Sequence, residues 1–222
     1  MSQVSTPSRI VILISGRGSN MHALIEQSSS DYSVGHVFSD RADAAGLKTA
    51  RELGIPARAL PAGKGVVRSD YDAALAAAID ECSPRLIVLA GFMRILSTQF
   101  VTRFAGRILN IHPSLLPKFP GLHTHRRAIE AHEREHGATV HFVTDQLDGG
   151  PRIIQGRVAV AADDTEESLS KRVQTQEHRI YPIAVKWFSN GRLRCDAGQA
   201  WLDGRPLNEP VQINEIEPER LS

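Results

Sequence analysis

The sequence has little of several features that would assign it to a specialised class of protein. Its 222 residues contain two cysteines, Cys82 and Cys195, which lie far apart and exclude a disulfide-stapled scaffold. The 26 Lys and Arg residues nearly balance the 25 Asp and Glu residues, so no basic surplus attracts nucleic acid or an anionic membrane. The longest apolar runs, Ile10–Ile14 and Leu86–Met93, are far shorter than the roughly 18–20 residues that span a bilayer. Because Met1–Ser8 contains no apolar leader, we expect a cytoplasmic protein that binds neither nucleic acid nor membrane.

What the sequence does contain is an alternation of short aliphatic runs and helix-like segments. Nearly continuous apolar runs are typical of strands that are buried on both faces, and helices between them typically form the crossovers of a parallel sheet. The pattern therefore predicts an α/β fold with one doubly wound, mostly parallel open sheet and helices on both faces. The predicted strands are Ile10–Ile14, Val34–Phe38, Leu86–Ala90 and Arg107–Ile111, and the predicted helices are Met21–Ser28, Ala42–Leu53 and Asp70–Glu81.

The pattern changes after Gly121. Thr124–His136 predicts a helix that Gly137 ends, and Thr139–Thr144 and Ile153–Ala161 predict strands. We expect these later strands to belong to a mixed or antiparallel edge of the sheet.

A long helix is predicted to begin near Asp164. Asp164 is the expected N-cap, Glu167 completes a capping box, and Pro182 is expected to kink or restart the helix. Two later turn pairs that end in glycine predict a small antiparallel C-terminal ribbon. We therefore expect one domain over residues 1–206, followed by a polar tail over residues 207–222 that is poorly ordered.

The loop after the first predicted strand has the composition of an anion site. Ligands of doubly wound sheets bind outside the carboxyl ends of the strands, and residues 15–20 read Ser-Gly-Arg-Gly-Ser-Asn at such an end. Its glycines allow a tight turn, and the helix that follows offers unpaired N–H groups to an anion. No Gly-Lys-Ser/Thr follows, and Met21 takes the third glycine position of the dinucleotide fingerprint. We therefore predict a phosphate site, with a purely structural glycine-rich turn as the alternative.

The histidines are concentrated in one region. Six of the nine fall between His112 and His141, and residues 132–136 match the H-E-x-x-H pattern of zinc hydrolases. In that chemistry two histidines one helical turn apart hold the metal and the glutamate activates water. Here the intervening residues are charged, and Gly137 directly follows the second histidine. The pattern favours a solvated helix end, so we expect no metal.

A second group of polar residues lies at the end of the fourth predicted strand. Asn110 and His112 stand two residues apart, so both side chains point to the same face of the sheet. An amide beside a histidine can polarise a carbonyl and move a proton. Asp148, on a glycine-backed turn, supplies a carboxylate that can orient an imidazole and raise its pKa. A strand-end histidine is more often a structural group, but the amide and the prolines that follow favour catalysis.

Six stretches resemble a known family and occur in that family's order. The family is that of the phosphoribosylglycinamide formyltransferases, folate-dependent enzymes of purine biosynthesis. They formylate glycinamide ribonucleotide with 10-formyltetrahydrofolate. The stretches are ISGRGSN (14–20), LAGFMRILS (89–97), LNIHPSLLP (109–117), PGLHTH (120–125), HFVTDQLDGGP (141–151) and RVQTQEH (172–178).

The resemblance implies roles for individual residues. The N-terminal half would bind the ribonucleotide, and the C-terminal half would bind the folate and carry the catalytic residues. The implied catalytic residues are Asn110, His112 and Asp148. The implied ribonucleotide contacts are Gly18, Ser19, Asn20, Gln174 and Glu177, and the implied folate contacts are Arg68, Met93, Arg94, Ile95, Leu96 and Asn110.

The implied reaction fits these residue types. The amine of the ribonucleotide would attack the formyl carbonyl, and Asn110 with a protonated His112 would stabilise the oxyanion. Asp148 would keep His112 charged, and a proton would pass to the departing folate nitrogen through His112 or water. Since an amine is a good nucleophile, neither a covalent intermediate nor a metal is needed, and 10-formyltetrahydrofolate is a cosubstrate.

Other functions stay open as alternatives. A 10-formyltetrahydrofolate hydrolase would carry an additional N-terminal domain, and a methionyl-tRNA formyltransferase an additional C-terminal domain. A zinc hydrolase would need stoichiometric zinc, and a non-catalytic nucleotide-binding module would leave Asn110, His112 and Asp148 without a role. The oligomeric state is not defined by the sequence, which is compatible with a homodimer.

Overall fold

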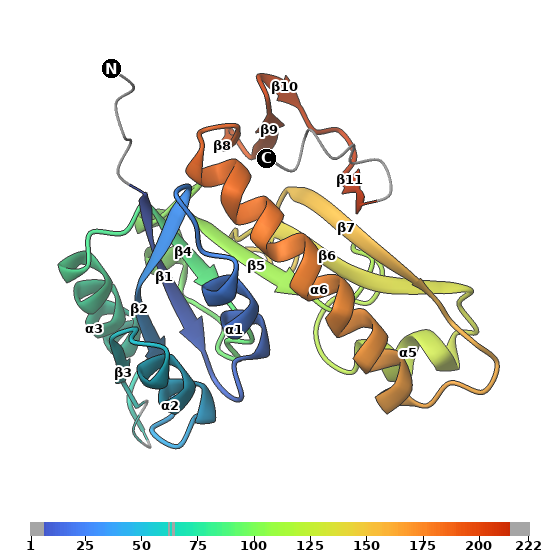
Figure 1. The fold of residues 1–222 in the computed structure, drawn as a ribbon, viewed down its shortest axis with the longest axis horizontal. Helices are drawn as coiled ribbons and strands as arrows, with labels where there is room; N and C mark the ends of the chain where they lie inside the picture. The colour runs from blue at the N-terminus through green and yellow to red at the C-terminus, as the bar shows by residue number, and fades with distance from the viewer. Residues whose placement is uncertain (1–6, 62, 64, 214–222) are drawn as a thin grey trace.

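The computed structural model describes residues 7–61, 63 and 65–213 and has three layers, with helices on both faces of a large sheet (Figure 1). Within these residues the large sheet has eight strands in the order β11-β7-β6-β5-β4-β1-β2-β3, and β8 to β10 form a separate three-stranded sheet. The strands are β1 (Ser8–Ile14), β2 (Tyr32–Ser39), β3 (Ala57–Ala59), β4 (Leu86–Leu89), β5 (Ile108–His112), β6 (Glu135–Phe142), β7 (Arg152–Ala159), β8 (Leu193–Asp196), β9 (Gln199–Leu202), β10 (Arg205–Pro206) and β11 (Val211–Gln212). The helices are α1 (Ser19–Glu26), α2 (Ala45–Glu52), α3 (Arg68–Glu81), α4 (Thr98–Arg103), α5 (Thr124–Glu130) and α6 (Glu166–Ser189).

Parallel pairing holds through the first half of the sheet. β1 lies between β2 and β4 and pairs in parallel with both, and β4 pairs in parallel with β5. β6 then pairs antiparallel with both β5 and β7, and β11 joins β7 in parallel. The predicted fold class is confirmed: an open, mostly parallel α/β sheet with a mixed C-terminal edge. The strand order reverses between β1 and β4, which is where such sheets bind ligands.

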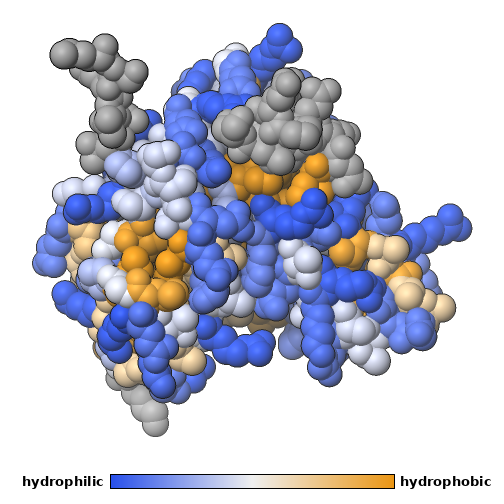
Figure 2. Space-filling view, viewed as in Figure 1, coloured by the Kyte–Doolittle hydropathy of each residue, from blue (hydrophilic) through white to orange (hydrophobic). Residues whose placement is uncertain are grey.

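The two faces of the sheet bury separate sets of apolar side chains. Along β1, Ile10, Ile12 and Ile14 belong to the core under α1, α2 and α6, whereas Val11 and Leu13 belong to the core under α3 and α4. All five side chains are fully buried, as period-two alternation requires when helices cover both faces. The outward sides of α1, α2 and α6 are mainly hydrophilic (Figure 2). None of the helices in the described part of the chain is long and apolar enough to cross a membrane.

The predicted helix Thr124–His136 is wrong in its second half. α5 is seven residues long, and the chain turns at His132, whose φ of 50° is left-handed, before it enters β6. Gly137 lies within β6, where an added Cβ would come within 2.0 Å of the carbonyl oxygen of Gly156 in β7. The glycine is therefore required by the close approach of two strands and does not mark a helix end.

The start of α6 differs by one residue from the prediction. Thr165 is the N-cap, and it exchanges hydrogen bonds with Ser168, whose backbone N–H donates to Thr165 Oγ1 at 3.1 Å and whose Oγ accepts from Thr165 N–H at 3.0 Å. Ser168 thus completes the capping box in place of Glu167. Asp164 accepts a hydrogen bond from Arg172 at 2.7 Å, so its carboxylate anchors the first turns of α6 from outside the helix.

α6 continues through Pro182 as one helix, so the expected restart is wrong. Proline has no N–H, and the carbonyl of His178, four residues earlier, therefore lacks its usual helical donor. Gln27 at the end of α1 supplies a replacement, because its Nε2 donates to that carbonyl at 3.2 Å. The contact satisfies the carbonyl and also holds α1 against α6.

The C-terminal strands form the predicted ribbon and one further strand. β8, β9 and β10 pair antiparallel. Val211 and Gln212 pair with Ile154 and Gln155 of β7, so part of the segment expected to be a poorly ordered tail belongs to the large sheet. Residues 214–222 of that tail lie outside the described residues. β3 and α4 are additional elements, three and six residues long, too short for a periodic pattern to reveal.

Tyr181 of α6 ties the carboxyl ends of β4 and β5 together, because its buried hydroxyl lies 3.0 Å from the carbonyl oxygens of both Leu89 and Leu109. We expect Tyr181→Phe to lower the free energy of unfolding by about 1–2 kcal/mol, since two buried acceptors lose their donor. Urea unfolding followed by circular dichroism measures this change. A free energy of unfolding equal to that of the wild type would contradict the role of the hydroxyl.

Candidate functional site

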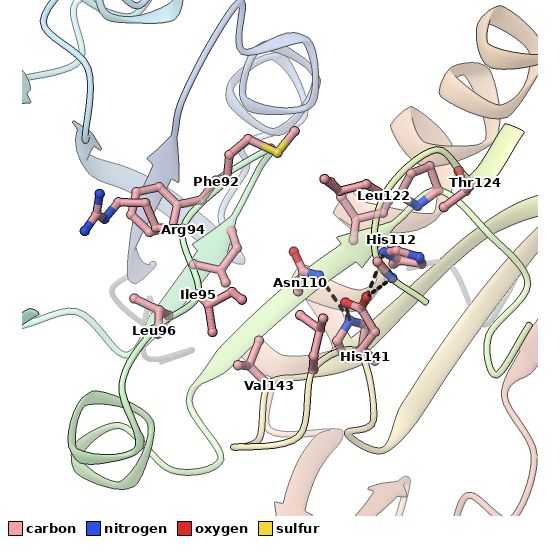
Figure 3. A pocket seen from close by; sticks show the side chains of 18 of the residues that line it. Phe92, Arg94, Ile95, Leu96, Asn110, His112, Leu122, Thr124, His141 and Val143 are labelled. Carbon is pink, nitrogen blue, oxygen red and sulfur yellow. Dashed lines mark hydrogen bonds and ion pairs between the residues drawn. The ribbon is translucent and has the colours of Figure 1, made fainter. Parts of the chain in front are cut away.

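A cavity of about 550 Å³ opens at the carboxyl ends of β4 and β5, beside the point where the strand order reverses. Its walls come from the loop after β4, from β5 and the loop that follows it, and from the turn after β6. Figure 3 shows Asn110, His112 and His141 gathered on one side, with Ile95 and Leu96 on the other. The cavity thus has a polar wall that faces an apolar wall.

The polar wall brings together Asn110, His112 and Asp148, which the sequence analysis singled out. Asn110 and His112 come from β5, and Asp148 comes from the turn after β6, where its φ is 51°. Nδ1 of His112 lies 3.5 Å from Oδ2 of Asp148, and its Nε2 lies 2.9 Å from the carbonyl oxygen of Phe119. The backbone N–H of Gly121 donates to the same Asp148 oxygen at 2.8 Å. Both ring nitrogens of His112 therefore face oxygen acceptors, and two loops hold the ring in place.

His141 is a fourth member of this cluster that the sequence analysis did not assign. Burial lowers the pKa of His141 to about 4, so the ring is neutral at pH 7. Its Nδ1 lies 2.8 Å from the carbonyl oxygen of Phe142 and must carry the proton, since a carbonyl only accepts. The bare Nε2 then accepts from Nδ2 of Asn110 at 3.1 Å. This bond orients the Asn110 amide and leaves its second N–H for a ligand. The residue went unassigned because only the pairing of Asn110 with His141 across β5 and β6 places it there.

The expected ribonucleotide residues meet where α1 contacts α6. Gly18 has a φ of 77° and precedes the first turn of α1. Nε2 of Gln174 donates to Oγ of Ser19 at 2.9 Å, and Nδ2 of Asn20 donates to Oε2 of Glu177 at 2.8 Å. Burial raises the pKa of Glu177. Residues from the two ends of the chain thus form one polar group beside the helix terminus, and Asn20 and Glu177 also line the cavity.

The apolar wall, formed by the loop after β4, and the loops that face it both carry hydrophobic side chains that are exposed. Met93 and Ile95, from the loop after β4, are 73% and 55% exposed, and Leu122 and Leu147, from the facing loops, are 69% and 56% exposed. Leu96, at the base of this wall, is buried. Exposed apolar side chains around one cavity indicate a ligand with a substantial apolar part. Leu122 and Leu147 gave no periodic signal in the sequence, because they lie in irregular loops.

Arg94 and Arg68 occupy different places from the other expected folate residues. The Arg94 guanidinium stacks over the ring of Tyr71, 4.3 Å from its centroid, and points away from the cavity (Figure 3). Arg94 is nevertheless among the residues that line the cavity. Arg68 is exposed at the start of α3 and is not part of the lining.

The residues of the H-E-x-x-H match are not arranged as that motif requires. His132 is in a turn and His136 is in β6, so the two are not one helical turn apart. His136 is buried, and its Nε2 lies 3.2 Å from Nδ1 of His125. No group of three or more His, Cys, Asp or Glu side chains that could hold a metal ion occurs among the described residues.

A loop suited to an anion and a loop suited to an apolar ligand meet at one amide–histidine–carboxylate cluster. This arrangement is expected of an α/β transferase that brings two ligands together at the carboxyl edge of its sheet. Comparison with known proteins defines the kind of group transferred. Residues 8–185 match the family model for formyl transferase.

Similar proteins agree with this match. The chain is 54% identical to the phosphoribosylglycinamide formyltransferase of Escherichia coli (strain K12) over 201 residues, 89% of this chain and 95% of that protein. The enzyme of the same name from Haemophilus influenzae is 42% identical, over 93% of this chain and 99% of its own length. A solved phosphoribosylglycinamide formyltransferase from Coxiella burnetii superposes with a TM-score of 0.87 at 46% identity, covering 92% of this chain and 99% of that one. The chain belongs to the formyl transferase family and is an enzyme.

The buried histidines predict how stability depends on pH. The pKa values of His136 and His141 are lowered to about 4, in both cases chiefly by burial. Between pH 6.5 and pH 4 the unfolded chain therefore binds protons that the folded chain does not. We expect the free energy of unfolding to be fully retained above pH 6.5 and to fall as the pH decreases toward 4. Urea unfolding at half-unit pH intervals measures this slope.

A matched pair of variants tests whether His136 contributes to the pH dependence of the free energy of unfolding. His136→Gln removes a buried histidine and should flatten the pH dependence, whereas His132→Gln removes an exposed one and should leave it unchanged. Equal slopes in the two variants would show that burial of His136 is not the cause.

Proposed function

We propose that this enzyme transfers the formyl group of 10-formyltetrahydrofolate to the amine of glycinamide ribonucleotide, a step of purine biosynthesis. The observation that carries the proposal is that Asn110, His112 and Asp148 line one cavity together with Asn20 of the first turn of α1 and the apolar loop after β4. Such a cavity suits a phosphorylated amine on one side and an aromatic formyl donor on the other. The names of the similar proteins agree with this substrate pair.

The cluster suits direct attack by the amine. As the nitrogen attacks the formyl carbon, the carbonyl oxygen becomes an oxyanion; the free N–H of Asn110 donates to it, and the positive charge of a protonated His112 stabilises it electrostatically. Asp148, 3.5 Å from His112, compensates the charge of the imidazolium. The proton lost by the attacking nitrogen passes to N10 of the departing folate, with His112 as the general acid and base.

The binding residues divide between the two ligands. The phosphate of the ribonucleotide binds at Gly18, Ser19 and Asn20, where the first turn of α1 presents N–H groups, and Gln174 and Glu177 contact the rest of it. The folate binds along Met93, Arg94, Ile95 and Leu96 and reaches Asn110. Arg68, outside the cavity, contacts the part of the folate that extends beyond it. Both cysteines are free thiols, which suits a cytoplasmic enzyme.

An absorbance assay tests the proposed reaction. Purified enzyme with 10-formyl-dideazafolate should release the deformylated product only when glycinamide ribonucleotide is present, and EDTA should leave the rate unchanged. Release without the ribonucleotide would instead indicate a hydrolase. A rate abolished by EDTA would indicate metal-dependent chemistry, and no release at all would contradict the proposed substrate pair.

Substitutions in the polar wall separate catalysis from binding. His112→Ala and Asp148→Ala should each lower kcat by about 10²–10⁴-fold, the range for loss of general acid–base catalysis, while the Kd for the ribonucleotide changes less than about twofold. Steady-state kinetics and calorimetric titration measure the two quantities. His132→Ala, at an exposed position outside the cavity, is the matched control. Wild-type turnover in His112→Ala or in Asp148→Ala would show that the substituted residue has no part in the mechanism.

A further inference from the structure

The first residue of the loop over residues 15–20 is buried, is bonded to the loop after β4 and is not part of the cavity lining. Ser15 directly follows β1 and is 6% exposed. Its backbone N–H donates to the carbonyl of Gly91 at 3.1 Å, and its Oγ accepts from the N–H of Met93 at 2.8 Å. The hydrogen bonding between β1 and β4 thus continues into the two loops. The Ser15 hydroxyl oxygen, which accepts from Met93 N–H, is the last acceptor in this series.

The loop after β4 is held both by packing and by hydrogen bonds to its backbone: Phe92 and Leu96 belong to the core under α3 and α4, and Arg94 stacks on Tyr71. Met93 and Ile95 are exposed toward the cavity, and Gly91 has a φ of 76° that gives the backbone a sharp turn. At its far end the loop is held by Asp72 of α3, whose Oδ2 accepts from the N–H of Ser97 at 2.6 Å. One hydroxyl and one carboxylate thus fix the backbone of this loop near its two ends, in addition to the packing of Phe92 and Leu96. Loss of either should let it shift.

On its other side, Ser15 leads directly into the anion loop. Gly16, the next residue, accepts from the N–H of Gly46 at the start of α2, and Gly18 begins the turn that opens α1. Because Ser15 and Gly16 are adjacent in the chain, a displacement of this loop would also move Ser15. The second anchor, Asp72, lies on α3 and has no such connection to the anion loop. Ser15 is thus the anchor shared by both loops.

We propose that Ser15 is a positioning residue that couples the two sites, so that occupancy of the anion loop favours binding of the folate at the loop after β4. This inference rests on the proposed function. Coupling requires an element that both ligands bias, and the Ser15 hydroxyl bonded to the Met93 N–H is that element.

The first test needs no ligand. Ser15→Ala removes the acceptor, so the amide proton of Met93 should exchange with solvent about tenfold faster or more, as measured by NMR. Ser189→Ala is a matched control, because Ser189 is also 6% exposed and its hydroxyl has no hydrogen-bond partner in the described part of the chain. Unchanged exchange at Met93 in Ser15→Ala would overturn the anchor, whatever the enzyme binds.

The second test measures the coupling. For the wild type we expect the Kd of a 10-formyl-dideazafolate analogue to be lower when glycinamide ribonucleotide is present. In Ser15→Ala the ratio of the analogue's Kd without the ribonucleotide to its Kd with the ribonucleotide should approach one. The Kd of the analogue should rise about three- to tenfold, and the Kd of the ribonucleotide alone should be unchanged. Ser15→Thr, which keeps the oxygen acceptor, should restore the ratio.

Each other outcome has a distinct meaning. If both affinities in Ser15→Ala weaken equally, with a loss of Tm beyond that of Ser189→Ala, the hydroxyl is merely structural and the inference fails. A wild-type ratio of one would also overturn the coupling but leave the proposed function intact. Failure of the wild type to bind the analogue at all would contradict the proposed function itself.

Discussion

The candidate site depends on one structural event, the reversal of strand direction between β5 and β6. Antiparallel pairing places His141 opposite Asn110, and the turn after β6 then carries Asp148 back to His112. The turn is tight: an added Cβ on Gly150 would lie 1.9 Å from the carbonyl oxygen of Phe142. The antiparallel edge is therefore what turns a nucleotide-binding type of sheet into a site with an amide, two imidazoles and a carboxylate.

A buried polar network fixes the loop that leaves β5. Oγ1 of Thr139 donates to the carbonyl of Ser114 at 2.7 Å and accepts from Leu116 N–H and from Nε2 of Gln155, both at 3.0 Å. Every group in this network has a partner, so it can stay buried without the cost of an unpaired polar atom. The loop consequently returns with the carbonyl of Phe119 beside Nε2 of His112. The buried network around Thr139 thereby sets the orientation of the His112 imidazole in the cavity.

The sequence predicted the parallel half of the fold far better than the half that follows Gly121. Strands such as β1 are buried on both faces, so their runs are apolar throughout and easy to recognise. His136 and Gly137 instead begin a strand whose first residues are polar or glycine, a composition that predicts a helix end, whereas the rest of that strand agrees with the predicted strand Thr139–Thr144. The candidate residues at strand ends could be found because a strand position fixes the direction of a side chain. The orientation of Arg94 toward Tyr71 could not, since it depends on packing against a distant helix.

The two imidazoles of the cluster carry different functions because their surroundings differ. His141 is buried, with its Nδ1 proton directed at the carbonyl of Phe142, and burial lowers its pKa to about 4, so at neutral pH it can offer only a bare nitrogen. Such a nitrogen accepts from Asn110, so the amide nitrogen lies beside His141 and, in the proposed reaction, its second N–H faces the formyl carbonyl. A protonated His141 would donate instead and would present the amide oxygen to a developing negative charge. Burial of His141 is therefore a condition for the electrostatics of the site, although the residue itself moves no proton in the proposed reaction.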